Sequence, residues 1–328
     1  MLIRDLHDGF ELDQVLLVRE VERRERRDGG GEYLRLTLAD RSGHLVAMVW
    51  EEVGEVVPLV SAGSPVHVLG RFVVHPRYGA QVNLRGLRRA EPGSFDPDDL
   101  LDGPQRAPDH MEADLRELIA TIQQPMLRTL LERLIGVGAD GWAAYRDAPA
   151  AKYYHQAYRH GLLEHSLTVG QAVSAISATF PGIDRDVAVT GALLHDIGKL
   201  DAYTDDPAKI DLTDDGRLQG EIALGYYRVR REMEEIEGFP PQLAKALLHI
   251  ILSHHGSHEH GSPVLPATRE ATLVHMVDNL GGRLGSFDRL EKELREGERW
   301  SGFDRALGGG AYFAARAPLE EAQRLDAA

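Results

Sequence analysis

Histidines and aspartates recur in apolar segments of the second half of the chain. His165 lies in GLLEHSLTVG, the pair His195-Asp196 in GALLHDIGKL, and Asp278 in HMVDNLGG. Facing helices of a bundle can direct such side chains to one point in its core. Imidazole and carboxylate groups are good ligands for divalent first-row metals, and a buried aspartate without a partner is costly. These four residues therefore predict a metal site.

Two features bear on how this site forms. His195 and Asp196 would point about 100° apart on an ideal helix. They can bind one ion only if the helix end deforms, and Gly198 lies where that could happen. His254 and His255, in LSHHG, are either metal ligands, phosphate contacts, or helix C-terminal histidines that suit the helix dipole. Of the two, His254 is the stronger candidate for a functional role.

Other polar residues of the second half of the chain could have a functional role or be ordinary structural or solvent-exposed residues. Lys199 follows the His-Asp pair and either offsets phosphate charge, holds Asp196, or is a solvated lysine at a helix end. His160 and His155 precede the first motif, and His160 is a candidate substrate contact. The remaining histidines are interpreted as helix-face, core or loop residues: His249, His258, His260 and His275.

Composition limits the alternatives. The chain of 328 residues has no cysteine, which excludes disulfides and thiolate metal sites. Its net charge is −15, whereas the first 92 residues carry 13 Arg, no Lys and 14 acidic residues, so a nucleic-acid surface has to be a local arginine patch. The N-terminus does not resemble a signal peptide and no apolar run reaches 18 residues. We expect a soluble cytoplasmic protein with no membrane partner.

The pattern of apolar residues divides the chain into two parts. Residues 10–90 hold short Val- and Leu-rich segments separated by Gly-containing turns, which is typical of a small barrel or sandwich. Residues 91–110 hold four prolines and no periodicity, and from residue 111 Leu and Ile recur at helical spacing. We predict a multidomain chain: an all-β barrel over 1–92, a linker over 93–110 and an all-α bundle over 111–328.

The first part resembles the OB-fold nucleic-acid-binding domains, in LTLADRSGHLVAMVW and VHVLGRFVVH. OB barrels combine an electropositive groove with aromatic stacking platforms. About half of the side chains on alternating strands should point inward, so each candidate is also a candidate core residue. Tyr78 is the best of them, because HPRYGAQ is a hairpin tip. The others are Tyr33, Trp50, Phe72, Arg35, Arg71, Arg77 and Arg85.

The second part resembles the HD phosphohydrolase superfamily, because LLEHSL, LLHDIGK and VDNL occur in its order. The resemblance implies that His165, His195, Asp196 and Asp278 hold the metal. An OB-fold barrel followed by an HD bundle is in turn similar to the YhaM-type 3′-5′ exoribonucleases. SHHGSHEHGSPVLPATREATLVHMVDNL and SFDRLEKELREGERWSGFDRALGGGAYF extend that similarity over residues 10–315.

There is one departure from the family pattern. Such proteins commonly carry a Gly-His-Ile element after the HD motif, whereas LQGEIALG has Glu221 in that place. Glutamate can bind a hard divalent ion or act as a base, and it can also be an ordinary first-turn helix acid. The change leaves open a second metal site and the choice of metal.

The resemblance implies metal-dependent hydrolysis of single-stranded RNA, with single-stranded DNA as a further substrate, from the 3′ end to 5′-mononucleotides. Mn²⁺ is the favoured ion, with Co²⁺ and Mg²⁺ as alternatives, and Lys199, His254 and Glu221 are the expected catalytic residues. Two rival hypotheses are a hydrolase of small nucleotides whose barrel serves regulation or assembly, and a nucleic-acid-binding adaptor with a vestigial HD site. A homo-oligomer is compatible with each.

Overall fold

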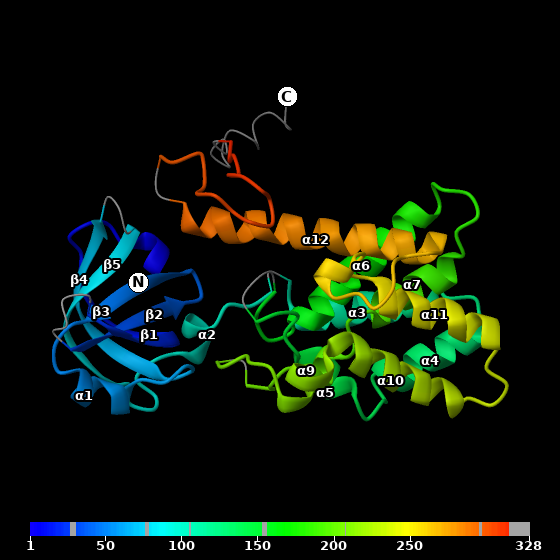
Figure 1. Cartoon of the computed structure of the whole chain (residues 1–328), viewed down its shortest axis with the longest axis horizontal. Coiled ribbons are helices and arrows are strands. Elements are labelled where there is room, and N and C mark those ends of the chain that lie inside the picture. The colour runs from blue at the N-terminus through cyan, green and yellow to red at the C-terminus, as the bar shows by residue number, and fades with distance from the viewer. Residues whose placement is uncertain are drawn as a thin grey trace.

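A computed structural model shows a β-barrel and a helical bundle lying side by side along the long axis of the molecule (Figure 1). The structure describes residues 1–26, 31–75, 79–104, 106–152, 156–206, 208–294 and 297–314. Each part has its own cluster of buried apolar side chains, one in the barrel and one in the bundle.

The barrel is closed by five strands in the order β1-β2-β3-β5-β4, with a parallel contact only between β3 and β5. Alternate residues of the second strand, Leu34, Leu36 and Leu38, point into the core, which is the period of two expected of a half-buried strand. The predicted OB-like barrel is confirmed. The strands are β1 (Glu11–Glu25), β2 (Glu32–Asp40), β3 (Gly43–Val49), β4 (Pro65–His75) and β5 (Gly79–Arg89).

Three short helices accompany the strands. The 3-10 helix η1 (Ile3–Asp5) precedes β1, and α1 (Val53–Val56) and η2 (Val57–Leu59) connect β3 to β4. The predicted linker contains α2 (Pro97–Leu100), whose Leu100 is buried. The backbone of Asp99 accepts a hydrogen bond from Arg41 at 3.0 Å. This segment therefore packs against the barrel instead of running free.

The remaining helices form the bundle, and α6 and α7 lie at its centre. Leu and Ile at three- and four-residue steps place one stripe of each outer helix against this pair. The bundle helices are α3 (Pro108–Ala120), α4 (Pro125–Ile135), α5 (Trp142–Asp147), α6 (Gly161–Ser177), α7 (Arg185–Leu194), α8 (Lys199–Ala202), α9 (Asp214–Gln219), α10 (Glu221–Glu234), α11 (Pro241–Ser253) and α12 (Arg269–Glu293), with η3 (His258–His260) before the last.

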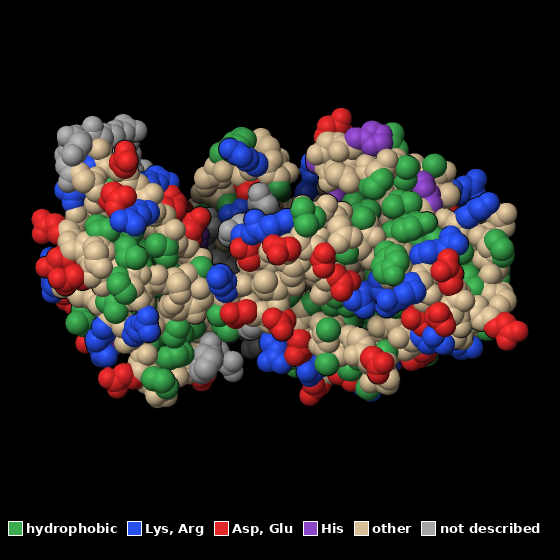
Figure 2. All heavy atoms as spheres, turned by 60° about the horizontal axis from the view of Figure 1, so that its bottom comes forward, with side chains coloured by type: hydrophobic (Ala, Val, Ile, Leu, Met, Phe, Trp, Pro, Cys, Tyr) green, Lys and Arg blue, Asp and Glu red, His purple; other side chains and the backbone are tan. Residues whose placement is uncertain are grey.

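Helix α12 is long enough to leave the bundle and reach toward the barrel (Figure 1). The segment after it folds back, where Phe313 contacts Phe287 with ring centroids 6.0 Å apart. Charged side chains of both signs are mixed over the face shown in Figure 2. None of the helices in the described ranges has the length and apolarity that crossing a membrane requires.

Substitution of Gly70 in β4 tests how closely the strands of the barrel pack. A Cβ added at Gly70 would lie 2.6 Å from the backbone oxygen of Asn83, in a strand that cannot move aside. We expect Gly70→Ala to lower the free energy of unfolding of the barrel by about 1–3 kcal/mol. Urea-dependent hydrogen exchange of the barrel amides measures this. Gly86→Ala is the control, because its Cβ would meet only the Leu69 side chain at 3.6 Å. Equal effects of both substitutions would contradict this explanation.

Candidate metal centre

The pair His195-Asp196 lies in a turn that follows helix α7, which is buried over most of its length. α7 is buried from Val187 to Leu194, because apolar or small residues occupy every side of it. The helix ends at Leu194, and residues 195–198 form a turn before α8. His195 keeps helical dihedrals, with φ of −56° and ψ of −36°, but the hydrogen bonds tighten from there: the amide of Ile197 donates to the Leu194 carbonyl and that of Lys199 to the Asp196 carbonyl. The regular α-helix thus ends where the pair begins.

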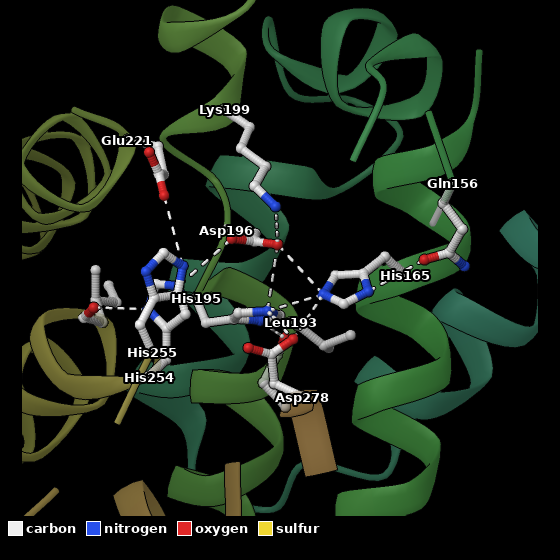
Figure 3. Close-up of polar contacts among 12 residues, drawn as sticks. Gln156, His165, Leu193, His195, Asp196, Lys199, Glu221, His254, His255 and Asp278 are labelled. Carbon is white, nitrogen blue, oxygen red and sulfur yellow. Dashed lines mark hydrogen bonds and ion pairs between the residues drawn. The ribbon is translucent and has the colours of Figure 1, made fainter. Parts of the chain in front are cut away.

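The other candidate ligands reach this turn from three helices (Figure 3). His165 comes from the first half of α6, Asp278 from the middle of α12, and His254 and His255 follow the last residue of α11. The structure thus brings together all of the ligands predicted from the sequence. His254 is completely buried, and His255 is partly exposed.

One group of ligand atoms is centred on His165. Its Nε2 lies 3.2 Å from Asp278 Oδ1, 3.2 Å from Asp196 Oδ2 and 3.1 Å from His195 Nε2. Ligands that surround one ion at about 2.0–2.2 Å are separated by roughly these distances. His165, His195 and Asp278, with one oxygen of Asp196, can therefore hold a single divalent ion.

A second group lies on the other side of Asp196. Its other oxygen, Oδ1, lies 3.5 Å from His254 Nε2, and His255 completes a set of three ligand atoms that lie within 4.8 Å of one another. Glu221 Oε1 is 3.5 Å from His255 Nε2. The Asp196 carboxylate thus faces both groups, one oxygen toward each.

The four histidines have the same orientation toward the centre. Nδ1 of His195 lies 2.7 Å from the Ala192 carbonyl, and Nδ1 of His254 lies 2.8 Å from that of Ile251. His255 uses the His260 carbonyl at 2.9 Å, and His165 uses the side-chain oxygen of Gln156 at 3.1 Å. Because these oxygens only accept, Nδ1 carries the proton and Nε2 is left to bind a metal.

Lys199 fixes the charge of the shared carboxylate. Its Nζ donates to Asp196 Oδ2 at 2.6 Å, and both side chains are largely buried. Burial opposes ionisation of Asp196, but Lys199 and His195 outweigh it and hold the pKa of Asp196 well below its usual range. Burial also lowers the pKa of His195, which Asp196 and Asp278 nevertheless raise to about 10. The cluster attracts positive charge strongly.

The residues fit a divalent cation. Asp196 Oδ1 and His254 Nε2 are buried and have no hydrogen-bond partner in the described part of the chain. Leaving such groups unpaired is costly. His165 Nε2 and His195 Nε2 face each other at 3.1 Å, which requires a proton or a cation between the two lone pairs. A ligand set rich in histidine suits transition-metal ions better than Mg²⁺, which prefers oxygen.

Gly198 shapes the site through a close backbone contact. A Cβ at this position would lie 1.9 Å from the backbone oxygen of Glu221 and 2.4 Å from the amide of Gly225. Its φ is −68°, so conformational freedom is not what requires glycine here. The absence of a side chain lets the first turn of α10 approach and places Glu221 beside the second group.

The remaining histidines of the bundle lie outside the two groups. The ring of His160 bonds the Arg146 carbonyl at 2.8 Å, and His249 accepts from the amide of Ala267. His275 supports the site indirectly, because its Nδ1 bonds the backbone oxygen of His254 at 2.8 Å. His258 and His260 lie in η3, and His155 falls outside the described residues.

The barrel residues predicted to bind nucleic acid differ in burial and in partners. Phe72 is only 4% exposed and belongs to the barrel core, so its assignment as a stacking platform was wrong. Tyr33 stacks on Trp50 with centroids 4.6 Å apart. Arg35 pairs with Glu22 at 2.7 Å and Arg85 with Glu11 at 2.6 Å. Arg77 and Tyr78 lie outside the described residues.

Gln156 is a site residue that the sequence did not single out. It adopts a left-handed conformation with φ of 55°, and it orients His165 through Nδ1. A glutamine in an irregular segment carries no periodic signal. A polar residue shortly before the first motif histidine is the only hint the sequence offers.

Comparisons with known proteins agree with this geometry. The HD-domain family profile matches residues 162–282. The 3′-5′ exoribonuclease YhaM of Bacillus velezensis is 30% identical over 295 residues, which is 89% of this chain and 92% of the relative. The YhaM proteins of Bacillus subtilis and of a Geobacillus species are each 29% identical; the alignments cover 89% and 88% of this chain and 92% and 88% of the relatives.

The role of Gln156 can be tested by metal binding. Gln156→Ala removes the acceptor of His165 Nδ1, so we expect metal affinity to fall by roughly 10–100-fold. Gln156→Glu keeps an acceptor in a residue of the same length and should bind at least as tightly as the wild type. Titration of the metal-stripped proteins against a competing chelator measures both. Equal losses in the two variants would argue against an orienting role.

Proposed function

The chain belongs to the YhaM family of 3′-5′ exoribonucleases and is a metal-dependent 3′-5′ exoribonuclease, and on that premise we propose how its residues perform the reaction. The observation that carries the proposal is the convergence of the Nε2 atoms of His165, His195 and His254 on two carboxylates, those of buried Asp196 and partly buried Asp278. RNA is the substrate that the relatives' name gives, and 5′-mononucleotides are the proposed products. Single-stranded DNA is a second substrate to compare.

We assign a ligand role to six residues of the two groups and, in addition, to Glu221. His165, His195, Asp278 and one oxygen of Asp196 would hold a first divalent ion. The other oxygen of Asp196 with His254 and His255 would hold a second, with Glu221 as an additional ligand in place of the family's histidine. Mn²⁺ is the proposed ion, with Co²⁺ next, because the set combines imidazoles with carboxylates, whereas Mg²⁺ prefers oxygen ligands alone. Such ions supply a nucleophile at neutral pH and stabilise charge on the phosphoryl oxygens.

The chain's own groups orient and balance this chemistry. Lys199 holds Asp196 in its ionised form and keeps its oxygens directed at the two groups. Its ammonium also adds positive charge close to the phosphate, where negative charge grows as the phosphodiester is cut. The four Nδ1 hydrogen bonds fix the imidazole rings, so little reorganisation is needed on the way to the transition state.

Activity tests this proposal directly. We expect the protein with Mn²⁺ to shorten 5′-labelled single-stranded RNA from its 3′ end as a ladder. Asp196→Asn should lower kcat/KM by at least about 1,000-fold, because both groups lose their shared ligand. Asp214→Asn is the control, since Asp214 is an exposed residue in the first turn of α9. Hydrolysis of small nucleotides with RNA left intact would reject the exonuclease function in favour of the nucleotide hydrolase.

Metal content tests the two-group assignment separately from activity. We expect the wild type to hold about two Mn²⁺ ions, and His255→Asn to retain one because only the second group loses a ligand. Glu221→His should keep both, since imidazole replaces a carboxylate as ligand. Elemental analysis after gel filtration gives the numbers. His255→Asn protein with the metal content of the wild type would contradict the second site.

A further inference from the structure

A cleft of about 760 Å³ lies between the barrel and the bundle, and His165 of the metal centre is one of its lining residues. The hollow between the two parts is visible in Figure 2. Its volume falls in the range of about 300–1,000 Å³ that is usual for ligand sites. The barrel contributes β1 and the turn between β2 and β3. The bundle contributes the segment before α6, the loop before α9, and α12.

Arg19 of β1 is placed in this cleft by an irregularity of the strand. β1 pairs regularly with β2 up to Val18, opposite Leu38, and resumes at Glu20, opposite Thr37. Arg19 is therefore the extra residue of a β-bulge. Bulges turn a side chain out of the regular alternation and are common beside active sites. Here the bulge puts a guanidinium among the cleft-lining residues.

Among the residues that the structure describes, the guanidinium of Arg19 has no hydrogen bond and no ion pair within 4 Å. The charged group that acts on it electrostatically is the carboxylate of Asp102. Arg19 is nevertheless half-buried. Two other arginines of the barrel are paired: Arg23 with Glu32, and Arg35 with Glu22. A half-buried cation without a direct partner is costly unless an anion completes it.

Lys209 faces the same part of the cleft from the opposite wall. A Cβ added at Gly63 would lie 3.2 Å from the Cβ of Lys209, so the loop before α9 touches the barrel at this glycine. The Gly63 amide in turn donates to the carbonyl of Val18 at 2.8 Å, directly before Arg19. Across the described residues, the Lys209 side chain makes no ion pair.

Several acids of the cleft are already engaged within the protein. Asp40 accepts hydrogen bonds from Ser42 and from the amide of Ile3. Asp211 pairs with Lys152 at 2.7 Å, and Glu164 accepts from Tyr158 at 2.5 Å. Three cations of the cleft are engaged as well: Arg41 pairs with Asp99, Lys152 with Asp211 and Arg289 with Asp304. Arg19 and Lys209 are the cleft cations without an ion pair to a described residue.

We propose that this cleft holds the sugar-phosphate backbone of the RNA strand upstream of the scissile bond, with Arg19 and Lys209 binding phosphates from the two walls. The inference rests on the proposed exoribonuclease function. Arg19 can bind a phosphate through two parallel N–H donors, whereas Lys209 acts as a point charge. The barrel thereby forms one wall of the substrate path, at the edge of β1 and not at the aromatic pair Tyr33–Trp50.

Two substrates of different length test the proposal on the manganese-loaded full chain. A 12-nucleotide single-stranded RNA would fill the cleft, whereas bis(p-nitrophenyl) phosphate reaches only the metal centre. We expect Arg19→Ala and Lys209→Ala each to lower kcat/KM on the RNA by about 10-fold, mainly through KM, and to leave the small phosphodiester unaffected. Arg19→Lys should lose less than Arg19→Ala because it keeps the charge.

The matched control is Arg23→Ala, which removes a paired arginine from the same strand outside the cleft. Its RNA kinetics should equal those of the wild type. The salt dependence gives an independent measure, because each lost phosphate contact should reduce the slope of log(kcat/KM) against log[salt] by about 0.7. Arg23→Ala should leave this slope unchanged.

Three results would overturn the proposal. Arg19→Ala with unchanged RNA kinetics would remove its main support, and equal losses on both substrates would show that the residue maintains the site or the fold. Losses in Arg23→Ala as large as in Arg19→Ala would indicate general electrostatics. A wild type that cleaves the small phosphodiester and leaves RNA intact would instead refute the exoribonuclease function itself, which the variants alone cannot do.

Discussion

The carboxylate of Asp196 lies buried between two groups of histidines, with one oxygen toward each, and accepts a hydrogen bond from Lys199. A charge in such a position is stable only when every neighbour is arranged to favour it. This constraint explains much of the surrounding structure. The helix before it must end, the lysine after it must turn back, and helices α6, α11 and α12 must each bring a ligand.

The backbone around this carboxylate is correspondingly close-packed. Gly198 lets α10 approach the turn that carries the pair, and Gly161 leaves room for the backbone oxygen of Gln156, which lies 2.0 Å from where a Cβ would stand. Gln156 adopts a left-handed backbone conformation, and in this position its side chain orients His165. The strain and the missing side chains thus lie next to the groups that must be held most exactly in place, as is common at functional sites.

The OB-like fold by itself does not show which surface of the barrel serves the metal centre of the bundle. Its familiar features, stacked aromatics and surface arginines, are largely satisfied within the barrel itself by ring stacking and ion pairs. The feature that relates it to the metal centre is a β-bulge at its edge, where the strand gives up regular pairing to aim Arg19 at the neighbouring domain. Fold and function therefore meet at the boundary between the two parts.

The sequence alone determined the two-part architecture and the choice of candidate ligands, because strand and helix periodicities and the HD motif are local patterns. His165, His195, Asp196 and Asp278 could be chosen for this reason. Tertiary structure decided the rest: that Phe72 is core, that Asp196 faces two groups of histidines, and that Gln156 bonds the ring of His165. These facts depend on contacts between segments that are distant in the chain, and on the point where a strand departs from its regular register. Local sequence patterns encode neither of them.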